Sequence, residues 1–289
     1  MKYTPEQLEK MLVKARLLGK VGQLKTKCGH TMYIIRDISG GDTILYIPDD
    51  VEIAEEKEQI VDDDVSYPTY YNIECKTLLV YGGKNLRDVS FMFYCCKAQS
   101  INLSNLDTSK VTNMCGMFDM CEAHSLDLSS FDTSNVTDMN QMFRSCKAQS
   151  LDLSSFDTSE VTDMSAMFYC CEAQSLDLSN FDTSNVTNMG GMFYLCEAHS
   201  LNLSSFDTSK VTDMDRMFYM CKAQSLDLSS FDTSNVTNMN SMFEECEAQS
   251  IDLSSFDTSN VENMDLMFFE CYSDVKATDP EILEELNRR

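Results

Sequence analysis

The sequence predicts an α/β solenoid, which is a stack of similar coils that each contribute one strand and one short helix. A repeat of 25 residues without insertions or deletions is the first observation behind this prediction. The other two observations are a strand pattern and a helix pattern within each repeat. Because neither half of a unit can bury its apolar side alone, the units have to stack. The dipeptide Met-Phe marks the repeat at Met92-Phe93, Met117-Phe118, Met142-Phe143, Met167-Phe168, Met192-Phe193, Met217-Phe218, Met242-Phe243 and Met267-Phe268.

One half of each unit is expected to be a strand. Leu151 and Leu153 alternate with Ser150, Asp152 and Ser154. Alternation with a period of two is typical of a strand that buries one face. Successive units are therefore expected to contribute parallel strands to one sheet, with the helix of each unit as the crossover.

The other half of each unit is expected to be a short helix. Met139, Met142, Phe143 and Cys146 stand at positions i, i+3, i+4 and i+7, which lie on one face of a helix. Thr137 stands where a capping hydroxyl is expected. Helix axes pack about 8–10 Å apart and strands about 4.8 Å apart. The helical side is therefore expected to be the longer one, with the sheet on the concave face.

Stacking also predicts a core in which each side chain packs on its own copy in the next coil. The repeated methionines and phenylalanines are expected to be core residues. Eight of the thirteen cysteines share one repeat position, and we expect buried free thiols there, with disulfides or a metal site as the alternatives. These cysteines are Cys96, Cys121, Cys146, Cys171, Cys196, Cys221, Cys246 and Cys271.

A solenoid exposes apolar faces at both ends and needs caps there. Residues 1–74 are predicted to form a small α+β capping module, in which Thr4 and Gln7 form a capping box at the start of a helix. Residues 75–271 are predicted to form the solenoid, with one degenerate and seven full units. Residues 272–289 are predicted to form a C-terminal capping helix, and the capped ends favour a monomer.

Charge restricts the partners. The chain has 22 basic and 47 acidic residues, a net charge of −25, so nucleic acid and anionic lipid are not expected partners. No run approaches the roughly 20 apolar residues of a membrane span, and no export signal or anchor is expected in this chain. Residues 49–64 hold nine acidic residues and one lysine and are expected to form a solvated loop.

The phrases "LDLSSFDTSNVTDM" and "MFYCC", joined at a fixed period, resemble the BspA-type leucine-rich-like repeats of bacterial surface proteins. The similarity covers roughly residues 75–271. It implies a leucine-rich-repeat-like, right-handed stack that is displayed at the cell surface or outside the cell, with a role in adhesion. It implies no catalytic residue.

The predicted binding site is the strip of polar side chains that point outward from the concave sheet. Carboxylates repeated at about 5 Å repel one another. We expect serine hydroxyls, water and partial protonation to offset this repulsion, and the alternative is that calcium or a cationic partner does so. The residues of the strip are Asn102, Asp127, Asp152, Asp177, Asn202, Asp227 and Asp252.

The helical side is the alternative binding face, because its residues differ between units. Catalysis needs unlike groups that converge in a cleft, whereas this chain repeats like groups in rows. We therefore expect an interaction module for a protein or glycan, not an enzyme, with no cofactor. A structural spacer without a ligand and a cation-binding ladder are the alternatives. The varied residues include Arg144, Tyr169, Tyr194, Arg216, Tyr219, Glu244 and Glu245.

Overall fold

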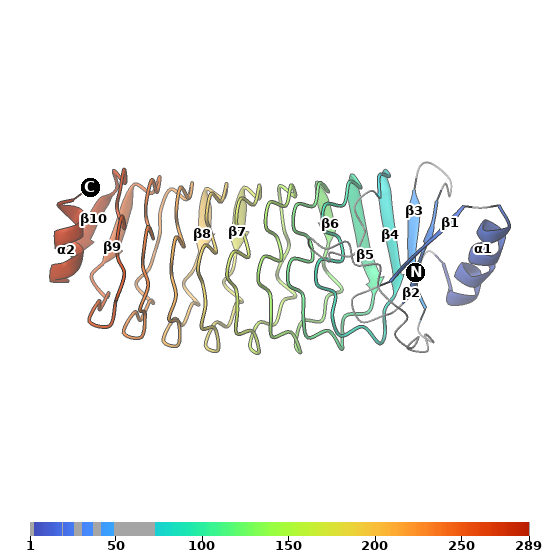
Figure 1. Cartoon of the computed structure of the whole chain (residues 1–289), viewed down its shortest axis with the longest axis horizontal. Coiled ribbons are helices and arrows are strands. Elements are labelled where there is room, and N and C mark those ends of the chain that lie inside the picture. Colours follow the sequence, from blue (N-terminus) through green and yellow to red (C-terminus); the bar gives the residue numbers. More distant parts are fainter. Residues whose placement is uncertain (1–2, 19, 26–30, 37–41, 49–72, 289) are drawn as a thin grey trace, which may run out of the picture.

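The computed structural model describes residues 3–18, 20–25, 31–36, 42–48 and 73–288. Within these residues the chain forms a parallel β-solenoid of about eight coils, and each coil advances the sequence by 25 residues. Figure 1 shows the coils in a row along the long axis of the molecule, with α1 at one end and α2 at the other. The predicted solenoid of 25-residue units is confirmed.

The strands occupy one side of the solenoid, and neighbours along the row are parallel from β3 onward. Between β5 and β6 and between β7 and β8, each strand residue pairs with the residue 25 positions further on, as Ser100 does with Ser125. Strands β1 to β6 form one sheet in sequence order, and β7 with β8 and β9 with β10 form two more. The elements are α1 Pro5–Leu17, β1 Val21–Lys25, β2 Thr31–Ile35, β3 Thr43–Ile47, β4 Thr77–Gly82, β5 Ser100–Leu106, β6 Ser125–Asp127, β7 Ser175–Asp177, β8 Ser200–Asn202, β9 Ser250–Leu253, β10 Asp274–Ala277 and α2 Pro280–Leu286.

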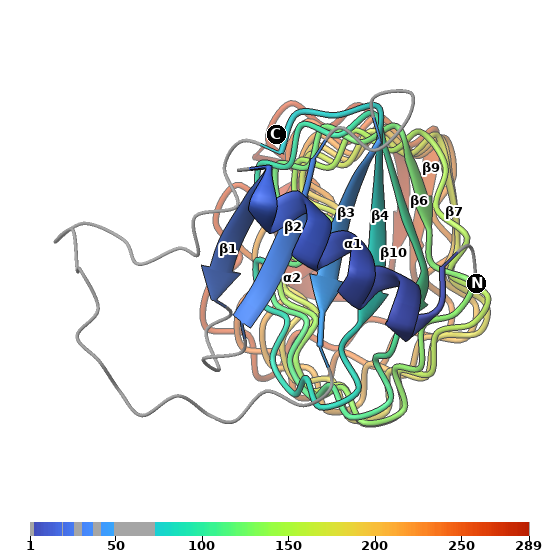
Figure 2. The same ribbon diagram turned by 90° about the vertical axis from the view of Figure 1, so that its right-hand side faces the viewer.

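Helix α1 packs on the outer face of the sheet at its N-terminal end, in front of the strands in Figure 2. The Thr4 side chain accepts a hydrogen bond from the Gln7 amide (3.3 Å), and the Gln7 side chain accepts one from the Thr4 amide (2.8 Å). Leu8, Leu12 and Ala15 are buried against outward residues of β2, β3 and β4. Alternate residues of these strands face the solenoid core, so the three strands are covered on both faces.

The sheet continues from the N-terminal strands into the solenoid, because β3 and β4 pair in parallel from Thr43↔Leu78 to Ile47↔Gly82. The domain boundary predicted at residue 74 stays a prediction. The acidic loop predicted at residues 49–64 lies outside the described residues.

At the C-terminal end, Asp279 caps α2 by accepting hydrogen bonds from the amides of Glu281 (2.9 Å) and Ile282 (3.2 Å). Ile282 is fully buried against the last coils, whereas Leu283 is 45% exposed. Helix α2 therefore covers only part of the last coil.

The helix predicted in each unit is wrong. Between Met139 and Cys146 the chain makes successive tight turns, one of which is closed by a hydrogen bond from the Met142 amide to the Met139 carbonyl (3.2 Å). Gln141 and Ser145 have φ values of 57° and 52°, in the left-handed region that bends the chain back. Each turn returns the chain to the core after three or four residues, so the spacing i, i+3, i+4, i+7 arises without a helix.

Amides that a helix would bond internally are bonded to the next coil instead. The Phe143 amide, which a helix would bond to the Met139 carbonyl, donates instead to the Met167 carbonyl (2.9 Å). Thr137, predicted to cap the helix, donates its hydroxyl to the Thr112 carbonyl of the preceding coil (3.2 Å). An isolated helix of two turns is marginal in water. Stacked turns satisfy the same backbone groups across coils, and this favours the solenoid.

Without helices, no wide layer forces the stack to curve. In Figures 1 and 2 the coils follow one another along a nearly straight axis. The leucine-rich-repeat-like α/β arrangement with a concave sheet is therefore corrected to a straight β-solenoid, and the sheet forms a strip along its side.

The core is built from side chains that stack on their own copies. The rings of Phe143 and Phe168 are nearly parallel, with centroids 5.8 Å apart. Met139 and Met142 are fully buried, as is Cys146. In the described part of the chain the eight repeated cysteines are buried free thiols. The predicted burial of these residues is confirmed.

Buried threonines join neighbouring coils. The Thr133 hydroxyl donates to the Asp157 carbonyl and accepts from the Asp157 amide, both at 2.8 Å. Thr158 makes the same pair of bonds with Asp182. A buried polar group costs free energy unless it is hydrogen-bonded. This pair of hydrogen bonds explains why Asp-Thr-Ser recurs in the units.

We expect Gly116→Ala to lower the melting temperature more than Gly191→Ala. Both glycines have positive φ, 57° and 60°, so an L residue costs about 1–2 kcal/mol at either position. A Cβ at Gly116 would lie 2.2 Å from the Phe91 ring, whereas a Cβ at Gly191 would meet nothing nearer than 3.8 Å. Thermal unfolding followed by circular dichroism measures the difference, and equal losses would contradict the packing at Gly116.

We also expect the free energy of unfolding to fall as the pH rises above about 9. Burial raises the pKa of Cys146 to about 11 and those of Cys221 and Cys246 to about 12, from 9.0. Below pH 9 the thiols are protonated in both states. Between pH 9 and the folded-state pKa only the unfolded chain loses protons, which favours unfolding.

Each pH unit by which the folded pKa exceeds the unfolded one corresponds to about 1.4 kcal/mol per thiol. Urea unfolding between pH 7 and pH 10.5 measures the effect. The midpoint is expected to be steady up to about pH 8.5 and to drop above it. A midpoint that does not change over the whole range would show that the thiols are not buried.

Candidate functional site

The predicted polar strip lies on the outer face of the sheet side, as expected, but on a straight surface. Each Asp or Asn of the strip forms a turn with the serine two residues on. In one coil, Asp152 Oδ1 accepts from the Ser154 amide (3.1 Å) and from the Ser154 hydroxyl (2.6 Å). Asn102 and Asp227 make the same two bonds with Ser104 and Ser229. The residues of the strip are exposed or half-exposed.

Hydrogen bonds and one cation favour the charged form of four aspartates of the strip. Hydrogen bonds from the serine two residues on hold the pKa values of Asp152, Asp177 and Asp227 below the ordinary range. Lys276 lies 2.8 Å from the Asp252 carboxylate at the C-terminal end and lowers the pKa of Asp252 to about 2, together with Ser254. These carboxylates are therefore charged at neutral pH, and the expected partial protonation is wrong.

A second row of aspartates repeats this geometry one turn along the coil. Asp157 Oδ1 accepts from the Ser159 amide (3.0 Å) and hydroxyl (2.7 Å), and these bonds lower its pKa. Asp107 does the same with Ser109. Both rows therefore shape tight turns in every coil, and their uniformity distinguishes no coil from another.

Side-chain diversity gathers on the side where the helices were predicted. We call this side the turn face, and define it by the four positions that Asn140, Gln141, Arg144 and Ser145 occupy in one coil. Their copies include glycine, alanine, leucine, methionine, tyrosine, aspartate and glutamate. None of these four side chains faces the core, where the copies are nearly alike. The turn face can therefore differ from coil to coil while the core stays the same.

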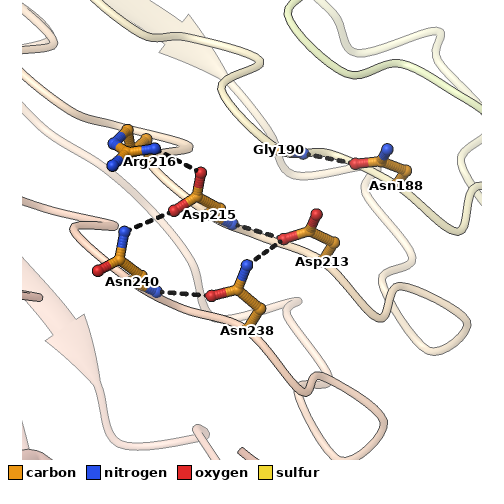
Figure 3. Close-up of polar contacts among 7 residues, drawn as sticks. All are labelled: Asn188, Gly190, Asp213, Asp215, Arg216, Asn238 and Asn240. Carbon is orange, nitrogen blue, oxygen red and sulfur yellow. Dashed lines mark hydrogen bonds and ion pairs between the residues drawn. The ribbon is translucent and has the colours of Figure 1, made fainter. Parts of the chain in front are cut away.

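A hollow of about 600 Å³ interrupts the turn face where Gly190 and Gly191 take the place of larger side chains. Asp215, Arg216 and Asn240 line it from the following coils. The Asp215 carboxylate accepts from Asn240 Nδ2 (2.7 Å) and forms an ion pair with Arg216 (3.0 Å), as Figure 3 shows. The hollow thus presents both signs of charge and an amide.

An Asp/Asn row fixes the backbone beneath the hollow. Asn188 Oδ1 accepts from the Gly190 amide (2.9 Å), and Asp213 Oδ1 accepts from the Asp215 amide (3.0 Å). Asn238 Nδ2 donates to Asp213 Oδ1 in the neighbouring coil (3.0 Å; Figure 3). Asparagine between aspartates supplies a donor to a row that would otherwise be all acceptors. The turns that present the hollow are therefore tied together along the axis.

Three stacked tyrosines form one wall of the hollow. Tyr169, Tyr194 and Tyr219 have parallel rings, with centroids 4.3 and 4.5 Å apart. Arg144 lies 5.3 Å from the Tyr169 ring centroid and forms an ion pair with the buried carboxylate of Asp119 (3.3 Å). Because the rings cover each other's faces, the wall offers ring edges and hydroxyl groups to a partner.

The two histidines of the solenoid do not approach each other, since His124 and His199 stand three coils apart and each lies near the strand side. Among the described residues, no group of three or more His, Cys, Asp or Glu side chains is placed to hold a metal ion. The arrangement on the turn face suits recognition by hydrogen bonds, ion pairs and ring edges.

Sequence reasoning named the tyrosines and arginines of the turn face but missed the hollow and the Asp/Asn row beneath it. The signals were present. Gly190 and Gly191 are adjacent glycines at positions where other units carry side chains. Asp or Asn directly precedes the first methionine in each full unit, as Asp138 precedes Met139, which is the pattern of an Asx turn.

Together, the fold and this surface define a class of protein. It is a straight repeat protein whose coils share one core and differ from one another on the turn face. The model of the family described as "Mycoplasma protein of unknown function, DUF285" matches residues 87–202 and 192–279. These matches span more than half of the chain, so the chain belongs to this family. No curated protein and no solved structure matches the chain.

The helices of the described residues, α1 and α2, are both too short and too polar to cross a bilayer.

We expect Arg144→Gln to lower the free energy of unfolding by about 2 kcal/mol at neutral pH, because it leaves a buried charge unpaired. Asp119 is 2% exposed, and burial raises its pKa although Arg144 opposes the rise. The loss is expected to shrink as the pH falls, because burial raises the pKa of Asp119 and protonation removes its unpaired charge. Urea unfolding at pH 5 and pH 7 measures both effects.

Asp119→Asn is the matched control, since it removes the charge and keeps the shape. It is expected to cost less than Arg144→Gln, and the double variant Asp119→Asn/Arg144→Gln should be more stable than Arg144→Gln alone. A double variant that is less stable than Arg144→Gln would mean that the ion pair does not govern this stack.

Proposed function

We propose that this protein is a non-enzymatic interaction module that binds a protein or glycan partner through its turn face. The observation that carries the proposal is the distribution of differences between coils. Core and strip positions are nearly constant, whereas the four turn-face positions carry most of the diversity. Recognition of a specific partner needs a surface that differs from place to place, and the turn face supplies it.

The hollow at Gly190 is the proposed centre of this surface. Tyrosine hydroxyls, the Asp215–Asn240 pair and Arg216 can donate and accept hydrogen bonds toward a polar partner. Tyrosine and arginine are enriched where binding energy concentrates in protein interfaces, and aspartate and asparagine suit the hydroxyl groups of a glycan. Both classes of partner therefore remain in the proposal.

The cellular setting is part of the same proposal. Similarity to BspA-type repeats supports display at a bacterial surface and a role in adhesion. The net charge of −25 disfavours nucleic acid as a partner. No cofactor is proposed.

A structural spacer is the second candidate, and the constant strip favours it, because a uniform surface serves length and rigidity without a ligand. Calcium is also a ligand to be tested, because the carboxylates of the strip are charged. Isothermal titration with calcium, combined with the melting temperature, tests this directly. Neither heat nor a thermal shift is expected if the serine hydroxyls suffice.

The central experiment compares two surfaces with variants that the repeats themselves provide. Gly190→Asn/Gly191→Gln fills the hollow with the residues found at the same positions in Asn140 and Gln141. Asp152→Asn/Asp177→Asn/Asp227→Asn changes the strip to the residue found at Asn102 and Asn202. We expect the first variant to lose at least tenfold in affinity for a ligand found on a glycan and matrix-protein array, and the second to bind like the wild type.

If the strip variant loses affinity and the hollow variant binds like the wild type, the binding site lies on the polar strip instead. Circular dichroism and melting temperature show that each variant is folded. An array on which the wild type binds no glycan and no protein would favour the spacer.

A further inference from the structure

Apolar side chains are exposed on α1, on the side that faces away from the sheet. Val13, Leu17 and Leu18 are 56%, 84% and 61% exposed. Lys10 and Lys14 stand three and four residues from these positions and are exposed on the same side of the helix. We call this side the α1 stripe. Along its last two turns the stripe alternates apolar groups with cations, and the exposed Glu6 lies on the same side in the first turn.

The opposite end of the solenoid also leaves apolar groups uncovered. In earlier coils the next coil covers Met239 and its copies completely, whereas Met264 in the last coil is only partly buried. Leu266 and Phe269 are 53% and 43% exposed, and Tyr272 is 89% exposed. The C-terminal end therefore carries apolar surface that neither a further coil nor α2 covers.

A pocket of about 410 Å³ lies at this end, where the last coil meets α2. Leu266, Phe268 and Phe269 supply its apolar lining. Asp265 supplies a carboxylate, and Glu285 supplies a second one that forms an ion pair with Arg288 of the same lining. We call it the terminal pocket. A helix docks in such a groove with apolar anchors on one face, and Val13 and Leu17 lie one turn apart on the same face of α1.

The charges of the two ends are complementary. Among the described residues of the N-terminal end, 3–18 and 20–25 hold five basic and two acidic residues, so their net charge is +3. Residues 262–289 hold eight acidic and three basic residues, so their net charge is −5. At physiological ionic strength charges are screened beyond about 8 Å. Two molecules that meet end to end therefore experience these local charges more than the total of −25.

We propose that the α1 stripe of one molecule docks in the terminal pocket of a second copy of this chain. Val13 and Leu17 contact the apolar lining, and Lys10 and Lys14 face the carboxylates of Asp265 and its neighbours. The two surfaces differ, so the contact is heterologous and every added copy leaves one free surface at each end. Copies then join head to tail into an open chain. This differs from the monomer expected from capped ends, because the caps leave apolar groups exposed.

Sedimentation velocity of the full chain over a wide range of concentrations tests the proposal. The sedimentation coefficient is expected to rise with concentration for the wild type. Leu17→Glu and Phe269→Glu alter exposed side chains, so both variants should fold. Each variant alone is expected to stay at the monomer value.

Mixing the two variants provides the decisive result, because each keeps the surface that the other has lost. The mixture is expected to form a dimer and nothing larger. Met120→Glu is the matched control: Met120 is 39% exposed on the turn face, away from both ends, and glutamate occurs at the same repeat position in Glu245. This control is expected to assemble like the wild type.

Three results would overturn the proposal. One is a wild-type sedimentation coefficient that does not change with concentration. Another is a failure of the variant test, whether the assembly persists in both variants or their mixture stays monomeric. The third is a protein that stays monomeric in solution but co-sediments with phosphatidylserine vesicles in a way that Leu17→Glu abolishes, which would make the α1 stripe a lipid-binding surface.

Discussion

Completion of each coil by its neighbour is the constraint on which the rest of this structure depends. Hydrogen bonds within a coil close its turns, but many other groups of the coil are satisfied only by the neighbouring coils. Backbone amides such as that of Met139 bond to the next coil, and the buried Thr133 hydroxyl does the same. Phenylalanine rings stack on their own copies. One shared register satisfies the backbone, the buried polar groups and the apolar core together, and this explains why the repeat tolerates no insertion.

The same constraint explains the backbone strain on the turn face. In described coils, residues equivalent to Gln141 and Ser145 have positive φ, whatever side chain they carry. Only Gly116 and Gly191 avoid the steric cost among them. Because the neighbouring coils impose the turn, side-chain identity at these positions is free to follow function. Strain and diversity therefore coincide on one face.

Much of the architecture could be predicted from the sequence, and the failures have one physical origin. The 25-residue repeat correctly predicted a stack of coils. The alternation around Leu151 correctly predicted the strand side of each coil and the outward direction of Asp152. The spacing of Met139, Met142 and Phe143 correctly identified core residues but not the backbone that carries them. Two successive tight turns place the same residues inward as a helix does. Curvature was then inferred from helices that do not exist.

The candidate site shows the same limit. Rows of charge are visible in a sequence, and so the polar strip was the natural choice. A hollow formed by the missing side chains of Gly190 and Gly191 becomes visible only when neighbouring coils are laid side by side. Serine hydroxyls hydrogen-bond the carboxylates of the strip, whereas the diversity of side chains between coils lies on the turn face.

The separation of a constant interior from a varied face has a consequence for how such chains change over generations. Duplication of one unit within the gene inserts a coil whose core side chains already fit those of the coils on either side of it. The new coil adds four turn-face positions that can mutate without disturbing the packing of its neighbours. Length and surface pattern can thus evolve independently, and related genes are expected to differ in the number of units before they differ in the core.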